Sequence, residues 1–78
     1  MTKEDLARYK GSKVTFERVS SFPDIKVQFV DSFPDFEIKQ ADSSSFSSVK
    51  IKYQEVTSFP DVKLRKVTAF GDFEIYFE

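Results

Sequence analysis

The sequence predicts a small, mainly β domain built as a compact repeat of short β-strands. Three observations lead to this fold class: a recurring Ser-Phe-Pro-Asp phrase, an apolar-charged-apolar triplet after each copy, and a length of only 78 residues. A repeat that runs through a whole chain constrains its architecture more strongly than any local preference. The copies of the phrase therefore define where each predicted element begins.

The repeat is anchored on a phenylalanine that occupies the same place in five successive units. The anchors are Phe22, Phe33, Phe46, Phe59 and Phe70, and they are spaced by 11, 13, 13 and 11 residues. Apolar residues stand three places after every anchor and three places before four of them. Because three is an odd number, strict alternation breaks at each anchor. We therefore expect the chain to bend there and all five rings to point into a common interior.

The residues that follow each anchor are typical of a turn. They are Pro23 and Asp24, Pro34 and Asp35, Pro60 and Asp61, and Gly71 and Asp72. Proline presets φ for a turn, and aspartate hydrogen-bonds nearby backbone, so we expect each Asp to cap its own corner. In the third unit Ser47 and Ser48 take these two places. Because a cis bond before a non-proline residue costs about 3 kcal/mol, all five corners are expected to be trans.

The triplets after the corners predict half-buried strands. They read IKV, FEI, VKI, VKL and FEI, starting at residues 25, 36, 49, 62 and 73. Such alternation places the apolar side chains in the core and the charged ones in solvent. The segment 13–19, KVTFERV, predicts an opening strand with Val14 and Phe16 turned inward.

The residues before the first strand predict a short helix. Thr2 is a suitable N-cap with Asp5 three residues on, and Gly11 is a suitable stop. Leu6 and Tyr9 share one face of this helix. We expect that face to cover an end or an open edge of the β structure.

The series SSFPD, DSFPD, SSFSS, TSFPD and AFGDF, spread over residues 14–77, resembles the septoil knot domain family of small bacterial proteins. The resemblance implies a backbone that winds twice around itself as a seven-crossing torus knot. Without it, units of 11 to 13 residues predict an unknotted, two-sided β-solenoid, and this alternative stays open. In either case we expect a single domain, 1–78, with an N-terminal helical segment, 1–12, and tandem repeats over 13–78.

Composition excludes several classes of function. The 12 basic and 13 acidic residues leave a net charge of −1, so neither a nucleic-acid footprint nor a polybasic membrane patch is expected. The sequence has no cysteine and no histidine, which removes thiolate and imidazole chemistry and most transition-metal sites. No apolar run is long enough for a membrane span, and no signal peptide is recognisable. We expect a cytoplasmic protein that carries no cofactor.

The sequence does not define a biochemical role. The four repeated aspartates could form a cation ladder, and the stretch ADSSSFSSV could hold a nucleophile, but turn chemistry accounts for both. We therefore expect a non-enzymatic structural or protein-interaction module with no catalytic or metal-binding residues. It would be a monomer or a weak homodimer, with an unknown protein partner. The alternative is a small-ligand or cation-binding domain that uses the repeated Asp and Ser corners.

Overall fold

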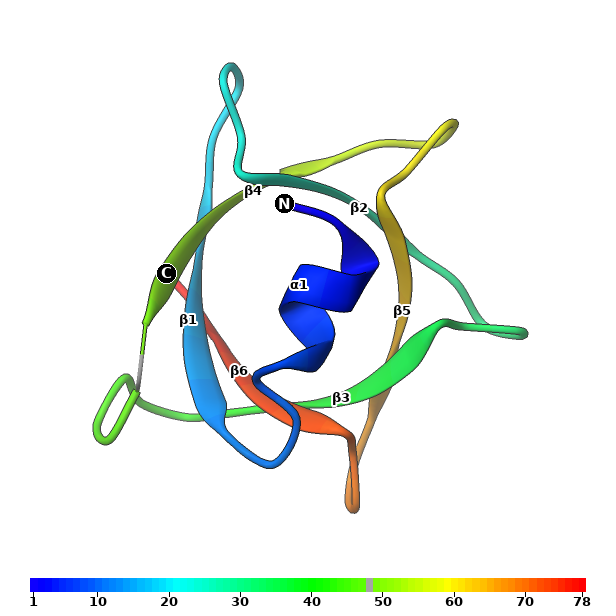
Figure 1. The fold of residues 1–78 in the computed structure, drawn as a ribbon. Helices are drawn as coiled ribbons and strands as arrows, with labels where there is room; N and C mark the ends of the chain where they lie inside the picture. The colour runs from blue at the N-terminus through cyan, green and yellow to red at the C-terminus, as the bar shows by residue number, and fades with distance from the viewer. Residues whose placement is uncertain (48) are drawn as a thin grey trace.

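In the residues that the structure describes, six short β-strands form a closed barrel, and a short helix lies across one end of it (Figure 1). The computed structural model describes residues 1–47 and 49–78. The elements in chain order are α1 (Lys3–Ala7), β1 (Lys13–Arg18), β2 (Ile25–Phe29), β3 (Phe36–Gln40), β4 (Lys50–Glu55), β5 (Val62–Val67) and β6 (Phe73–Phe77). No helix in these ranges is long and apolar enough to cross a membrane.

The order of strands around the barrel is β1-β4-β2-β5-β3-β6, and each neighbouring pair is parallel. The chain therefore passes around the barrel nearly twice: β1, β2 and β3 take alternate places, and β4, β5 and β6 fill the places between them. Every hydrogen-bonded ladder joins a strand of the first winding to a strand of the second. Because β6 also pairs with β1, the sheet closes and has no open edge. The two-sided solenoid is therefore wrong.

The connections between strands are unusually short for parallel pairing. Parallel neighbours normally need a crossover of a dozen residues or more. Here the segments 19–24, 30–35, 56–61 and 68–72 are each five or six residues long. They suffice because the end of one strand and the start of the next lie on either side of the same residue of the strand between them, as Arg18 and Ile25 both pair with Tyr53. Figure 1 shows each strand running around the barrel wall, with each turn projecting outward before the next strand begins.

The inner faces of the strands form the core, as the triplets predict. The residues at most 1 % exposed are Leu6, Val14, Phe16, Ile25, Val27, Ile38, Ile51, Val62, Leu64, Phe73 and Ile75. Tyr53 is also buried, and Phe29, Phe36, Val49 and Phe77 pack against this cluster while staying partly exposed. The alternation of buried and exposed positions in β2, β4, β5 and β6 confirms the predicted inward and outward faces there, whereas in β1 Thr15 is buried as well as Val14 and Phe16.

The N-terminal helix is capped as predicted but is shorter. The Thr2 hydroxyl accepts a hydrogen bond from the Asp5 backbone N–H, and the Asp5 carboxylate accepts one from the Thr2 backbone N–H. These bonds from Thr2 hold the pKa of Asp5 below its usual value. The helix ends at Ala7, ahead of the predicted stop, and Gly11 adopts φ of 81° in the turn that leads to β1. Leu6 is completely buried, which confirms that the helix covers one end of the β structure.

Candidate functional site

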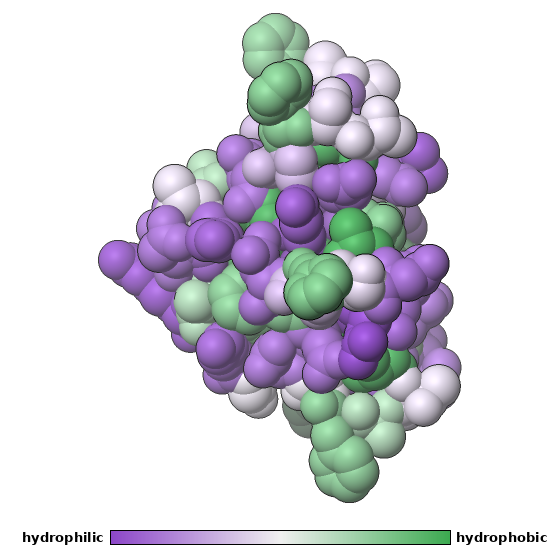
Figure 2. All heavy atoms as spheres, turned by 90° about the vertical axis from the view of Figure 1, so that its right-hand side faces the viewer, coloured by the Kyte–Doolittle hydropathy of each residue, from purple (hydrophilic) through white to green (hydrophobic). Residues whose placement is uncertain are grey.

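The five anchor phenylalanines lie on the outside of the barrel, so the prediction that they point inward is wrong. Their side chains are 93 to 99 % exposed: Phe22, Phe33, Phe46, Phe59 and Phe70. In Figure 1 the five turns project on different sides of the barrel. Figure 2 shows green side chains projecting from a largely purple, hydrophilic face, at the top, in the middle and at the bottom of the view. These rings contribute no burial to the domain itself.

The backbone conformation explains why the rings point outward. All five anchors have positive φ, between 50° and 64°. A residue in this left-handed conformation reverses the direction of the chain locally. The core residues three places before and after the anchor can then both point inward while the anchor itself points outward. The expectation of trans corners is confirmed: within 1–47 and 49–78 the backbone contains no cis peptide bond.

Phenylalanine is a poor choice for such a conformation on physical grounds. A left-handed backbone costs a residue with a Cβ about 1–2 kcal/mol, and Gly or Asn occupies it more readily. Strain of this kind is usually offset by packing or tied to function. Since the rings are almost fully exposed, packing within the domain does not offset it. The choice of an aromatic side chain at these positions is therefore not explained by the fold.

The repeated aspartates hold neighbouring strands together rather than capping their own corners. Asp24 donates its backbone N–H to the Lys52 carbonyl, and its carboxylate accepts the Lys52 backbone N–H at 2.9 Å. The same pair of bonds joins Asp35 to Lys63, Asp61 to Lys26 and Asp72 to Glu37. The partner lies 28 or 35 residues away in each case, on the adjacent strand. We call these four pairs the aspartate locks.

Each aspartate lock extends a parallel ladder by one residue at the amino end of a strand. Asp24 precedes β2 and bonds to β4, and Asp35 precedes β3 and bonds to β5. The carboxylate accepts the hydrogen bond that a backbone carbonyl would accept if the ladder continued. The backbone N–H of the adjacent strand is therefore satisfied although the ladder ends there. The prediction that each Asp binds a backbone N–H is therefore right, but the prediction that this N–H belongs to its own corner is wrong.

The two departures from the Pro-Asp pattern have different local surroundings. A side chain at Gly71 would bring its Cβ within 2.7 Å of the Lys39 nitrogen and 2.9 Å of the Ile38 carbonyl carbon. Gly71 is required there because the backbones approach so closely. In the third corner the Ser47 hydroxyl accepts a hydrogen bond from the Thr15 hydroxyl at 2.8 Å and donates one to the Val49 carbonyl. Ser48 lies outside the described residues.

The structure does not bring the predicted corner residues together as a catalytic or metal-binding cluster. Each of the four repeated carboxylates is used by a different lock, on a different strand pair. Across residues 1–47 and 49–78, no three acidic side chains are grouped so that they could hold a metal ion. The residues that stand out are instead the five anchor phenylalanines, whose side chains are almost fully exposed.

The fold and the turns define a small closed barrel of parallel strands that displays aromatic rings on its connections. The model of a protein family described as the 7(1) septoil knot domain matches residues 11–78. The chain therefore belongs to the septoil knot family. A curated relative, "Uncharacterized protein UU089.1" of Ureaplasma parvum serovar 3 (strain ATCC 700970), is 63 % identical over 41 residues. That match covers 53 % of this chain and 46 % of the relative, so the chain spans about half the length of the relative.

Proposed function

We propose that this chain is a non-enzymatic protein-interaction module and that its five turn phenylalanines are the contacts it offers. The observation that carries the proposal is the exposure of all five rings, 93 to 99 %, at five equivalent turns with positive φ. A single exposed apolar side chain needs no explanation. Five at one repeat position, each in a conformation unfavourable for phenylalanine, point to a use outside the barrel.

The energetics favour such a use. A phenylalanine ring that becomes fully enclosed buries about 150–250 Å², and full burial of such a side chain is worth about 1.5–3 kcal/mol before the costs of association. Aromatic residues are enriched among the residues that dominate binding energy. The turns also hold the backbone of each ring in one conformation, which reduces the ordering cost on binding. Several rings enclosed together would therefore support a specific contact.

The arrangement of the turns suggests the shape of the partner. Because the turns project on different sides of the barrel, one flat surface meets only neighbouring turns (Figure 1). We infer a protein partner with apolar pockets, either wrapping around the barrel or present in several copies. The net charge of −1 gives no reason to expect nucleic acid.

Photo-cross-linking in the cells that naturally make the protein tests this proposal. A photoreactive phenylalanine analogue replaces Phe33 or Phe59, and as a matched control it replaces Lys63, which is also exposed but lies on a strand. We expect a discrete adduct with one protein from the two turn positions and none from Lys63. Absence of adducts at the turns, or the same adducts from Lys63, would contradict the proposal.

We further infer that this backbone carries the seven-crossing torus knot after which the family is described. Two observations support the inference: the two windings of strands alternate around the barrel, and the connections between strands are short. The chain therefore passes nearly twice around the barrel in the same direction. Unfolding a single molecule by force applied at its two ends tests it. A knotted chain should stop short of the full extension of about 3.3–3.6 Å per residue, whereas an unknotted chain should reach it.

A further inference from the structure

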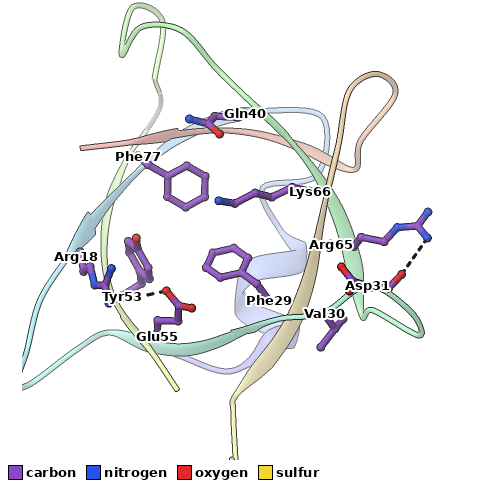
Figure 3. A pocket seen from close by; sticks show the side chains of 10 residues that line it. All are labelled: Arg18, Phe29, Val30, Asp31, Gln40, Tyr53, Glu55, Arg65, Lys66 and Phe77. Carbon is purple, nitrogen blue, oxygen red and sulfur yellow. Dashed lines mark hydrogen bonds and ion pairs between the residues drawn. The ribbon is translucent and has the colours of Figure 1, made fainter. Parts of the chain in front are cut away.

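The two ends of the barrel are filled differently. At the amino ends of the strands α1 closes the barrel with the buried Leu6. At the carboxyl ends there is a cavity of about 410 Å³, and all six strands contribute side chains to its lining (Figure 3). This volume lies within the usual range for small-molecule sites, which in parallel sheets also tend to lie at the carboxyl ends of strands.

Aromatic rings form the floor of this cavity. Phe29 and Phe77 pack edge to face with centroids 5.9 Å apart, and Tyr53 packs against them at 6.5 and 5.8 Å. Tyr53 is buried, whereas Phe29 and Phe77 are half-buried. Figure 3 shows the Phe29 and Phe77 rings at the centre of the opening. The floor therefore offers an apolar surface on which a flat ring can pack.

A lysine ammonium lies over this floor. The Lys66 Nζ atom is 4.8 Å from the Phe29 ring centroid and 4.9 Å from that of Phe77. In the part of the chain that the structure describes, no carboxylate lies within ion-pair distance of Lys66. The two arginines at the rim each have a carboxylate partner: Arg18 pairs with Glu55, and Arg65 pairs with Glu37. Lys66 is thus the cation of this site that is left for a ligand.

We propose that this cavity binds a small aromatic monocarboxylate, whose carboxylate pairs with Lys66 and whose ring packs on Phe29 and Phe77. The Lys66 side chain is exposed and lines the cavity, so its ammonium can meet an incoming anion directly. A cation is disfavoured because the Lys66 ammonium near both rings would repel it. A dianion is disfavoured because Asp31 and Glu55 also line the cavity.

Other polar groups converge on the same opening. Figure 3 shows Gln40 and Lys66 reaching toward it from different strands, with Tyr53 beside the Arg18–Glu55 pair. Burial raises the pKa of Tyr53, so its phenol stays protonated and can donate a hydrogen bond. A few convergent polar groups over an apolar floor are typical of sites that orient one kind of ligand.

Titration with 1-naphthoate, followed by calorimetry and by NMR shifts of the cavity residues, tests the proposal. The full chain should bind one equivalent, and Lys66→Met should weaken the affinity at least about tenfold because a charged contact is lost. Lys63→Met is the matched control, since Lys63 is an exposed lysine on the same strand and does not line the cavity. It should change the affinity less than about twofold.

Two further probes separate the contributions of charge and ring. Uncharged 1-naphthylmethanol and ring-free acetate should each bind at least about tenfold more weakly than 1-naphthoate. The proposal is overturned if 1-naphthoate shows no saturable binding up to about 10 mM. It is also overturned if Lys66→Met binds as tightly as the natural chain, or if the shifted NMR signals lie outside the cavity.

Discussion

Replacing Asp35 by alanine removes the carboxylate half of an aspartate lock, together with an exposed ion pair to Lys3, and leaves the backbone half in place. The Asp35 backbone N–H still donates to the Lys63 carbonyl at 2.8 Å, but the Lys63 backbone N–H loses the carboxylate that accepts it at 2.8 Å. A hydrogen bond to a charged acceptor contributes about 1.5–3 kcal/mol to stability when buried. Because 28 % of the Asp35 side chain is exposed, we expect water to reduce the loss to about 1–2 kcal/mol.

Urea unfolding followed by circular dichroism measures this loss. Asp35→Asn keeps an acceptor oxygen and should lose less than half as much as Asp35→Ala. Asp42→Ala is the control, since Asp42 is an exposed aspartate that takes part in no aspartate lock; it should change the free energy of unfolding by less than about 0.5 kcal/mol. Equal stability of Asp35→Ala and Asp42→Ala would refute the reasoning that the repeated aspartates hold the two windings together.

Three other changes test the core, a close approach of two backbones and the helix cap. Phe16→Ala should cost about 3–5 kcal/mol in urea unfolding because the ring is fully buried; a loss below about 1 kcal/mol would contradict this. Gly71→Ala should destabilise by more than Gly11→Ala, for which about 1 kcal/mol is expected, because only at Gly71 does the new Cβ meet backbone atoms. NMR titration should give Asp5 a pKa below 3.8 that rises in Thr2→Ala. Since folding lowers this pKa, the contribution of Asp5 to stability is present above its unfolded pKa and is lost as the pH falls through the folded pKa. An unchanged pKa of Asp5 in Thr2→Ala would refute the role of the cap.

The strands and the core were predictable because they depend on local alternation. The triplets place Ile25 and Val27 inward and Lys26 outward, and the barrel has them so. The partners of each strand were not predictable in this way. Neighbours such as β2 and β4 are brought together by the winding of the whole chain, and the alternation of one strand carries no information about which other strand it meets.

The outward position of the anchors had a signal in the sequence that the spacing argument missed. Two residues on either side of Phe33 stand Asp31 and Asp35, and the corresponding positions around the other four anchors are also polar. A core residue in a strand normally has apolar neighbours at these positions, because they share its face. The left-handed conformation itself could not be inferred, since phenylalanine does not favour it, and three of the five anchors precede a proline, which favours extended backbone.

The partners of the aspartate locks were hidden for a similar reason. Turn chemistry predicts that an aspartate at this position of a turn binds a backbone N–H, and each of the four does so. It does not predict an N–H from a strand 28 or 35 residues away, because that proximity arises only when the second winding is in place. The two ends of the Phe-Pro-Asp phrase thus have different roles: the Phe side chain is exposed, whereas the Asp bonds to the adjacent strand.

Unfolding of a variant in which all five anchors are replaced by asparagine tests this division most directly. The variant carries Phe22→Asn, Phe33→Asn, Phe46→Asn, Phe59→Asn and Phe70→Asn. Asparagine tolerates positive φ, and almost no buried ring surface is lost, so the free energy of unfolding in urea should be unchanged or higher. A decrease of more than about 3 kcal/mol would contradict the account, because it would mean that the five rings stabilise the barrel rather than face a partner.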